Sequence, residues 1–313
     1  MKIILPALCC CLFNLSASAQ QLPLFTQYRE YAGILNPGSV PHDYLVYDQN
    51  LSFGASYRRQ WINDQDGPAT QMVRADYLWL RGNVNPIFGA YLMNDKAARV
   101  GTTGAYTRIG MMTGDAENGF SAGLSAGVVR YGLNLMNARL DDATDPLLTG
   151  SVRARIAPDV GAGVFGHATL SGNLLYGGVS VPQILGWKLS FNNASQEVLS
   201  IRRTQHYYAL AGYKIALEDE NFLEFSSWVR FIPALKPNFD LNMRFQMHQA
   251  FYIGTGLNSA RMAHFESGLT LGTNSDRERL VRIGLGADLS FAKTNAFYGN
   301  SIEVNCAICL KKD

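Results

Sequence analysis

The chain has 313 residues, of which 47% are apolar and 17% are charged, and its formal net charge is +2. This balance excludes a disordered chain, which needs low hydrophobicity and high net charge. It also excludes a nucleic-acid binder that depends on a basic surface, because the chain is nearly neutral. The 30 glycines, 16 phenylalanines and 15 tyrosines, with a mean hydropathy of −0.03, favour a large β-structure.

The first 19 residues have the form of a secretory signal peptide. Lys2 precedes an apolar run over residues 3–15, and Ala17-Ser18-Ala19 matches a small-residue cleavage site. The apolar run is shorter than the roughly 20 residues that a membrane-spanning helix needs. We therefore expect cleavage after Ala19, a mature chain that begins at Gln20, and export from the cytoplasm.

The segment 20–50 shows neither a helical nor a strand period. Asn36 and Pro37 mark a turn, whereas the leucines and aromatic residues around Phe25 indicate that the segment packs on something. We expect a periplasmic N-terminal segment that acts as a plug of a lumen or as a docking element. The alternative is a flexible leader.

From residue 51 onward, apolar and polar residues alternate with a period of two, which is typical of strands. In the segment 238–247 every odd position is Phe, Leu or Met and every even position is polar. The segments 279–289 and 302–310 repeat the pattern. Fourteen strands are predicted, at 51–61, 70–79, 86–93, 102–112, 119–131, 157–167, 173–181, 205–216, 221–232, 237–247, 250–259, 262–272, 279–290 and 301–311.

The connections between these strands alternate in length. Every second connection has six residues or fewer, at 80–85, 113–118, 168–172, 217–220, 248–249 and 273–278, and the long ones at 132–156 and 182–204 belong to the other set. Outer-membrane barrels have an even strand number, short periplasmic turns and longer outer loops, whereas a soluble β-sandwich has no reason to sort its loops in this way. The sequence thus predicts an all-β, antiparallel transmembrane β-barrel of about 14 strands over residues 51–313, located in the outer membrane.

The polar faces of the predicted strands carry charges of both signs. If the apolar faces meet lipid, these charges face the lumen and can pair there, because each would cost several kcal/mol on the lipid face. The inward residues are Arg58, Arg74, Asp76, Glu224, Arg230, Asp240, Arg244, Glu266, Arg282, Asp288 and Glu303. Near strand ends we expect aromatic girdles that contain Trp61, Trp79, Tyr131 and Trp228.

Two apparent enzyme motifs fit strand composition better than catalysis. Ser121 and Ser125 lie in overlapping G-x-S-x-G sequences, but the nucleophile elbow needs a strand, a sharp turn and a helix. Both serines fall in one continuous alternating segment. The G-x-G-x-x-G sequence at 161–166 lacks the βαβ context of a dinucleotide site.

No metal or redox site is predicted either. Cys306 and Cys309 are three residues apart on a predicted strand, so they point to opposite faces. The acidic cluster at 141–145 in the long 132–156 loop lacks the spacing of a dedicated calcium site. The five histidines, at positions 42, 167, 206, 248 and 264, show no metal-ligand spacing. We therefore predict no catalytic residue, no metal and no cofactor.

A set of short motifs follows the whole mature chain. The residues that carry them are Gln27, Tyr28, Asn36 and Pro37 near the start, Arg58, Gln60, Trp61, Pro68 and Thr70 in a Y-R-x-Q-W and P-x-T pair, and later Asp159, Asp240, Asn242 and Glu303. In this order they resemble the motifs of the PorP/SprF family of outer-membrane proteins from the type IX secretion and gliding-motility machinery. The resemblance makes these residues candidate structural or docking residues.

The resemblance implies an accessory component of protein secretion, not an enzyme, that assists export or surface anchoring of specific cargo such as gliding adhesins. Implied partners are periplasmic ring components of the machine, a secreted cargo protein at the cell surface, and membrane lipid, with no nucleic acid. We hypothesise that the periplasmic turns and segment 20–45 bind the machine, and that the two long loops contact cargo. The alternatives are a porin-like or small-molecule channel and an outer-membrane hydrolase.

Overall fold

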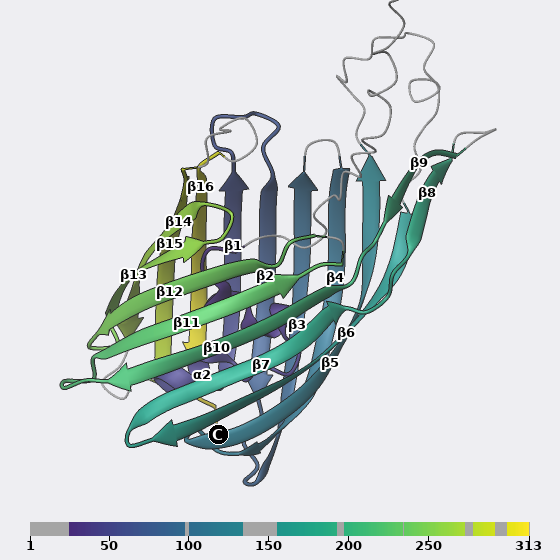
Figure 1. Cartoon of the computed structure of the whole chain (residues 1–313). Helices are drawn as coiled ribbons and strands as arrows, with labels where there is room; N and C mark the ends of the chain where they lie inside the picture. The colour runs from purple at the N-terminus through teal and green to yellow at the C-terminus, as the bar shows by residue number, and fades with distance from the viewer. Residues whose placement is uncertain are drawn as a thin grey trace, which may run out of the picture.

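Fourteen strands close into an antiparallel barrel, as Figure 1 shows for this computed structural model. The structure describes residues 25–97, 100–133, 155–192, 197–233, 235–272, 278–291 and 299–312. The barrel strands are β1 (Leu51–Gln60), β2 (Ala69–Leu78), β3 (Val84–Ala97), β4 (Val100–Gly114), β5 (Asn118–Leu133), β6 (Arg155–Leu170), β7 (Asn173–Gln183), β10 (His206–Ala216), β11 (Phe222–Phe231), β12 (Asn238–Met247), β13 (Phe251–Asn258), β14 (Met262–Gly272), β15 (Arg279–Ser290) and β16 (Ser301–Leu310). The predicted fold is confirmed.

Strand β7 pairs directly with β10, and the chain between them forms an extra hairpin. Strands β8 (Lys188–Asn192) and β9 (Glu197–Arg202) pair only with each other. The sequence analysis predicted a loop without strands over 182–204, and this prediction was wrong in part. The hairpin leaves the barrel wall, as Figure 1 shows.

Strands β3 and β4 are longer than predicted, because their pairing continues beyond the apolar part of the wall. Asn94 pairs with Thr103, and Lys96 pairs with Gly101. Outside the apolar band both faces of a strand meet polar surroundings, so these residues show no alternation. Period two therefore could not reveal this extension.

The two ends of the barrel differ. The turn end carries short connections and none of the long ones, together with the start of β1 and the end of β16, where Leu51 pairs with Leu310. At the β6–β7 turn Ser171 and Gly172 have φ values of 50° and 81°, which suits a two-residue turn that matches strand twist. The other end, here called the loop end, carries the connections that include 134–154 and the β8–β9 hairpin.

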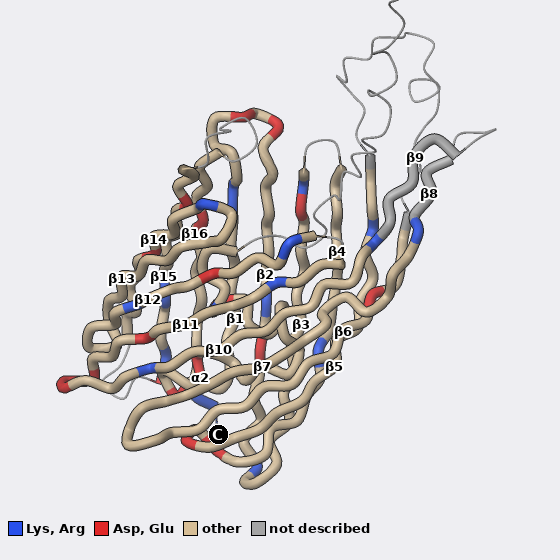
Figure 2. Tube along the Cα trace, in the orientation of Figure 1, with Lys and Arg blue, Asp and Glu red and all other residues tan. Residues whose placement is uncertain are grey.

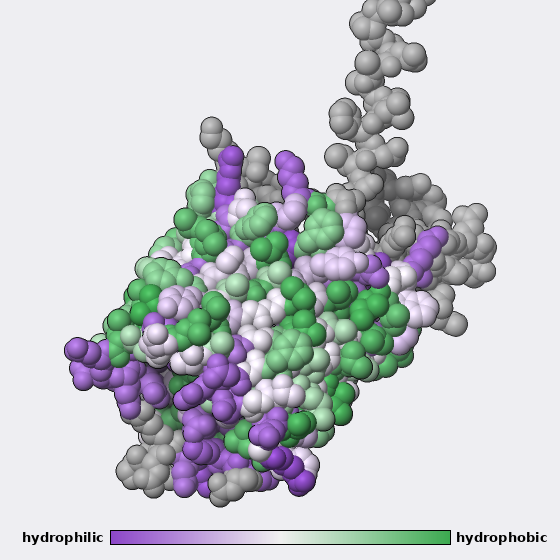
Figure 3. Space-filling model, turned by 60° about the horizontal axis from the view of Figure 1, so that its bottom comes forward, coloured by the Kyte–Doolittle hydropathy of each residue, from purple (hydrophilic) through white to green (hydrophobic). Residues whose placement is uncertain are grey.

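The wall has an apolar outer face and a polar inner face. The outward side chains of β12, such as Phe239 and Leu241, are exposed, whereas its inward Asp240 and Arg244 are buried. Charged positions of both signs follow the strands in Figure 2. Figure 3 shows an apolar belt on the wall, with hydrophilic residues gathered toward the turn end.

Two of the four predicted girdle residues face the lumen instead. Tyr131 and Trp228 are buried, with 3% and 5% exposure. Trp228 has the same strand parity as Glu224, so the pleat turns both side chains inward. The girdle prediction for these two residues was wrong because it used position along the strand and neglected parity.

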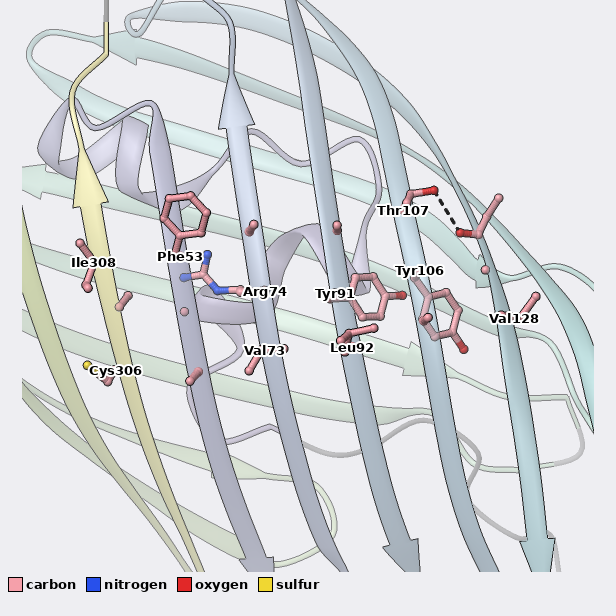
Figure 4. Close-up of a pocket in the computed structure, with 18 residues that line it drawn as sticks. Phe53, Val73, Arg74, Tyr91, Leu92, Tyr106, Thr107, Val128, Cys306 and Ile308 are labelled. Carbon is pink, nitrogen blue, oxygen red and sulfur yellow. Dashed lines mark hydrogen bonds between the residues drawn. The ribbon is translucent and has the colours of Figure 1, made fainter. Parts of the chain in front are cut away.

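A groove of about 1000 Å³ crosses the outer face over β16 and β1–β5. Figure 4 shows this part of the wall, in which Phe53, Leu92 and Val128 border the groove. Its floor consists of the small outward residues Ala55, Ala75, Ala90, Ala105 and Ala126. Because the lining is apolar, lipid chains are its natural covering.

The first described residues fold inside the barrel as three short helices: η1 (Tyr28–Tyr31), α1 (Ala32–Leu35) and α2 (His42–Tyr47). They appear in purple within the ring of strands in Figure 1. Across the described ranges, no helix is both long and apolar enough to cross a membrane.

Candidate functional site

Residues 25–50, here called the plug, occupy the lumen. Phe25, Tyr28, Ile34 and Leu35 are buried in one cluster with inward residues of the wall, including Trp228. The plug also brings charged side chains into this interior. Because a buried charge is costly unless it is paired and hydrogen-bonded, each needs partners on the wall.

The acidic side of the plug binds two arginines of neighbouring wall regions. Arg282 Nη1 and Nη2 lie 2.6 and 2.5 Å from the two carboxylate oxygens of Glu30, and Arg282 Nη2 lies 2.7 Å from Asp43 Oδ1. Arg74 Nη2 lies 3.2 Å from Glu30. Burial alone would raise the pKa of Glu30, but Arg282 and Arg74 hold it well below its usual range. Glu30 therefore stays ionised at physiological pH.

The basic side of the plug binds acids on β11 and β14. Arg29 Nε lies 2.8 Å from Glu224, and Arg29 Nη1 lies 2.9 Å from Glu266. The Tyr28 hydroxyl donates to Ser226, and the Tyr28 ring stacks on Trp228 with centroids 5.9 Å apart. Residues 28–30 thus connect β11 and β14 with β2 and β15.

Near the loop end, the backbone of the plug binds a carboxylate. The amides of Thr26 and Gln27 donate to Glu303 at 2.8 and 3.3 Å, and Arg58 forms ion pairs with Glu303 and Asp288. The Thr26 hydroxyl donates to Asp288 at 2.9 Å. His264 extends this network, because its two ring nitrogens lie 2.6 Å from Asp288 and 2.7 Å from Asp240.

The turn at Asn36 to Gly38 rests on a seat of glycines in β5, β6 and β7. A Cβ at Gly123 would lie 2.3 Å from the Pro37 carbonyl oxygen, and a Cβ at Gly163 would lie 2.0 Å from Asn36 Oδ1. Asn36 Nδ2 donates to the Val164 carbonyl at 2.9 Å. The missing side chains therefore let the plug approach the wall backbone closely.

Wall side chains also bind the backbone of this turn. Arg108 donates to the carbonyls of Pro37 at 3.2 Å and Ser39 at 2.7 Å, and it pairs with Asp76 at 2.7 Å. The Ser121 hydroxyl donates to the Gly38 carbonyl at 2.6 Å. Ser121 of the G-x-S-x-G motif thus holds the plug.

The structure brings together six of the sequence-predicted residues. Gln27, Tyr28, Asn36 and Pro37 belong to the plug, and Arg58 and Glu303 bind it; the Gln27 side chain also accepts from Tyr252 at 2.7 Å. The remaining seven lie on or beside the wall. The backbone amide of Gln60, beside Trp61, donates to the Pro68 carbonyl at 2.8 Å, and the Thr70 hydroxyl donates to Asp95 at 2.6 Å. Asp159 pairs with Arg203 at 2.6 Å. Asp240 binds His264, and Asn242 faces Gly256.

Sequence reasoning missed the plug residues that carry charge and the wall residues that hold its backbone. These are Arg29, Glu30, Asp43, Arg108, Ser180, Gly123 and Gly163. One signal was available, since Arg29 and Glu30 interrupt an aromatic segment that was expected to pack on something. Charges in such a segment require buried partners of opposite sign.

Cys306 and Cys309 are free, with Cys306 exposed and Cys309 buried, so they lie on opposite faces of β16. Within the described ranges, no group of three His, Cys, Asp or Glu side chains could hold a metal ion. The acidic cluster at 141–145 lies outside the described residues.

His42 provides a pH-dependent contribution to stability. Burial, and then Arg244, lowers its pKa to about 3, and its Nε2 has no hydrogen-bond partner. Below pH 6.5 His42 takes up a proton in the unfolded chain but not in the folded chain. The free energy of unfolding therefore decreases as the pH is lowered, by at most about 1.4 kcal/mol per pH unit. Between pH 7.5 and 5, we expect wild type to lose up to about 2 kcal/mol more than His42→Gln in urea unfolding. Equal losses in both proteins would contradict this.

Comparison with known families identifies the chain. A match to the family described as "Type IX secretion system membrane protein PorP/SprF" covers residues 17–308. The chain belongs to the PorP/SprF family. The resemblance that the motifs indicated is therefore confirmed, and type IX secretion is the system to which this membrane protein belongs.

Solved structures share the fold of this PorP/SprF family protein. The CymD monoaromatic hydrocarbon channel has 9% identity and a TM-score of 0.51, covering 85% of this chain and 91% of that one. The toluene transporter TodX of P. putida has 9% identity and a TM-score of 0.53, covering 89% and 92%. At this identity the likeness concerns the outer-membrane barrel fold alone. A comparison with curated proteins finds no match.

Proposed function

We propose that this PorP/SprF family protein is an accessory component of type IX secretion that assists export or surface anchoring of specific cargo. The observation that carries the proposal is the occupied lumen. The plug is bound to wall strands that include β2, β11, β14 and β15. A cavity between it and β6, β7, β10 and β11 has only about 40 Å³, room for a few water molecules. A secreted protein needs a far wider path, so the barrel acts through its two ends.

At the loop end, the connection 134–154 and the β8–β9 hairpin are the proposed contacts for cargo. At the turn end, the short turns are the proposed contacts for periplasmic ring components. Tyr28, Arg29 and Glu30 face the wall and are buried, so these plug residues fill the lumen instead of binding the machine. The part of the plug proposed for contacts with the machine is therefore α2 with the exposed Asp48, which lies at the turn end.

The test replaces residues 134–154 by a short turn and, separately, shortens the β8–β9 hairpin. We expect surface attachment of the dependent cargo to be lost while the barrel remains in the outer membrane and other type IX cargo is secreted normally. Cargo is quantified on intact cells and in the medium. A matched control shortens the connection 232–237, which lies at the same end.

Unchanged cargo secretion and attachment in both loop variants would refute the role of the loop end. The assignment of ring contacts is tested separately, by affinity purification of the tagged barrel. Variants with charge-reversed turn residues, such as Asp219→Lys, should then lose ring components while keeping cargo.

A small-molecule channel is the second candidate, because the fold is shared with the monoaromatic hydrocarbon channel CymD and the toluene transporter TodX. Stable single-channel conductance of the purified protein in a planar bilayer, with normal cargo secretion in the deletion strain, would favour it. The filled lumen predicts no stable conductance for the intact protein.

A further inference from the structure

The plug has a direction within the barrel. Its first residues lie near the loop end, because the amides of Thr26 and Gln27 bind Glu303, the third residue of β16 from that end. Its last helix lies near the turn end, where the Tyr47 hydroxyl donates to Gln246, the penultimate residue of β12. The chain therefore descends through the lumen before it turns back into β1.

The upper part of the plug is fixed in place. Glu303 accepts two consecutive plug amides, Asp288 accepts the Thr26 hydroxyl at 2.9 Å, and Arg58 pairs with both carboxylates. All three wall residues are buried, and Phe25 stacks on Tyr31 with ring centroids 4.0 Å apart. Thr26 is thus held at the depth of Arg58.

Chain length decides where the preceding residues can lead. Arg58 is two residues below the loop end of β1, about 7 Å along the strand. It is seven residues above the turn end, about 23 Å, through a lumen that the plug already fills. With cleavage after Ala19, five residues precede Phe25, and they extend at most about 17 Å. They reach the loop end with length to spare but cannot return to the turn end.

We propose that the mature N-terminus leaves the barrel at the loop end and is presented at the cell surface. It carries a free α-ammonium group and a polar Gln20-Gln21 start into the region that cargo meets. The proposal rests on barrel orientation and not on the cargo role, so either can fail without the other.

The test labels single cysteines on intact cells with a membrane-impermeant maleimide. The background carries Cys306→Ala and Cys309→Ala, which remove the two cysteines outside the expected signal peptide. Gln21→Cys is the probe, Gln65→Cys marks the loop end, and Asn83→Cys marks the β2–β3 turn. Both marker positions are exposed.

We expect Gln21→Cys to label on intact cells to the same extent as Gln65→Cys, whereas Asn83→Cys labels only after the outer membrane is permeabilised. Labelling of Gln21→Cys only after permeabilisation would overturn the proposal, and so would no labelling in either condition. Mass spectrometry of the purified protein checks the N-terminus, and retention of the first 19 residues would also overturn it.

Discussion

Replacement of Arg282 by methionine should lower the free energy of unfolding by about 3–5 kcal/mol. Glu30 and Asp43 would then remain buried, with Arg74 as their nearest cation at 3.2 and 3.7 Å. Breaking a buried ion pair leaves an uncompensated charge, which costs more than the pair itself contributes. The measurement is urea unfolding in lipid vesicles, followed by tryptophan fluorescence.

Arg230→Met is the matched control, since Arg230 also points inward but forms no ion pair with a carboxylate of the described residues, whereas Arg282 pairs with Glu30 and Asp43. A second variant, Glu30→Gln in the Arg282→Met background, removes one of the stranded charges and should restore part of the loss. If Arg282→Met costs no more than Arg230→Met, the ion pairs do not hold the plug.

Substitution of Gly123 by valine should displace the plug while the barrel remains closed. The first added carbon alone would lie 2.3 Å from the Pro37 carbonyl oxygen, which belongs to backbone and cannot rotate away. Overpacking of this kind costs about 1–3 kcal/mol. We expect faster trypsin cleavage after Arg29, which is 4% exposed in the native protein, and the appearance of conductance in a planar bilayer.

Gly132→Val is the control for this experiment, because Gly132 lies on the same strand and a Cβ there meets nothing within 4 Å. Its cleavage rate and conductance should match wild type. Identical behaviour of Gly123→Val and Gly132→Val would mean that the glycine seat does not position the plug.

The barrel could be predicted from the sequence because its governing pattern is local. Alternation over 238–247 defines a strand with one lipid face, and the same parity that places Glu224 inward also places Trp228 inward. The inward position of Trp228 could therefore have been predicted. The β3–β4 extension could not be predicted, since polar surroundings on both faces remove the alternation.

The contacts of the plug could not be predicted from one sequence. Thr26 and Glu303 are 277 residues apart, and no local pattern links an amide donor to a carboxylate at that separation. Five inward arginines of the wall (Arg58, Arg74, Arg230, Arg244 and Arg282) were identified, but choosing which two bind Glu30 requires the barrel register. Gly123 and Gly163 stood out only as members of the apparent G-x-S-x-G and G-x-G-x-x-G motifs, whereas their role depends on Pro37 and Asn36, which lie opposite them.

The position of the plug clamp also bears on how the protein is assembled. Arg58 and Glu303 are direct register partners across the seam where the first strand meets the last, and Arg74 and Arg282 belong to the strands that flank this seam. Residues made first are thus secured by residues made last. A truncated chain that lacks the last strand would lose the seam and the Glu303 contacts together. The pairing that closes the barrel and the carboxylate that binds the first plug residues therefore belong to the same last strand.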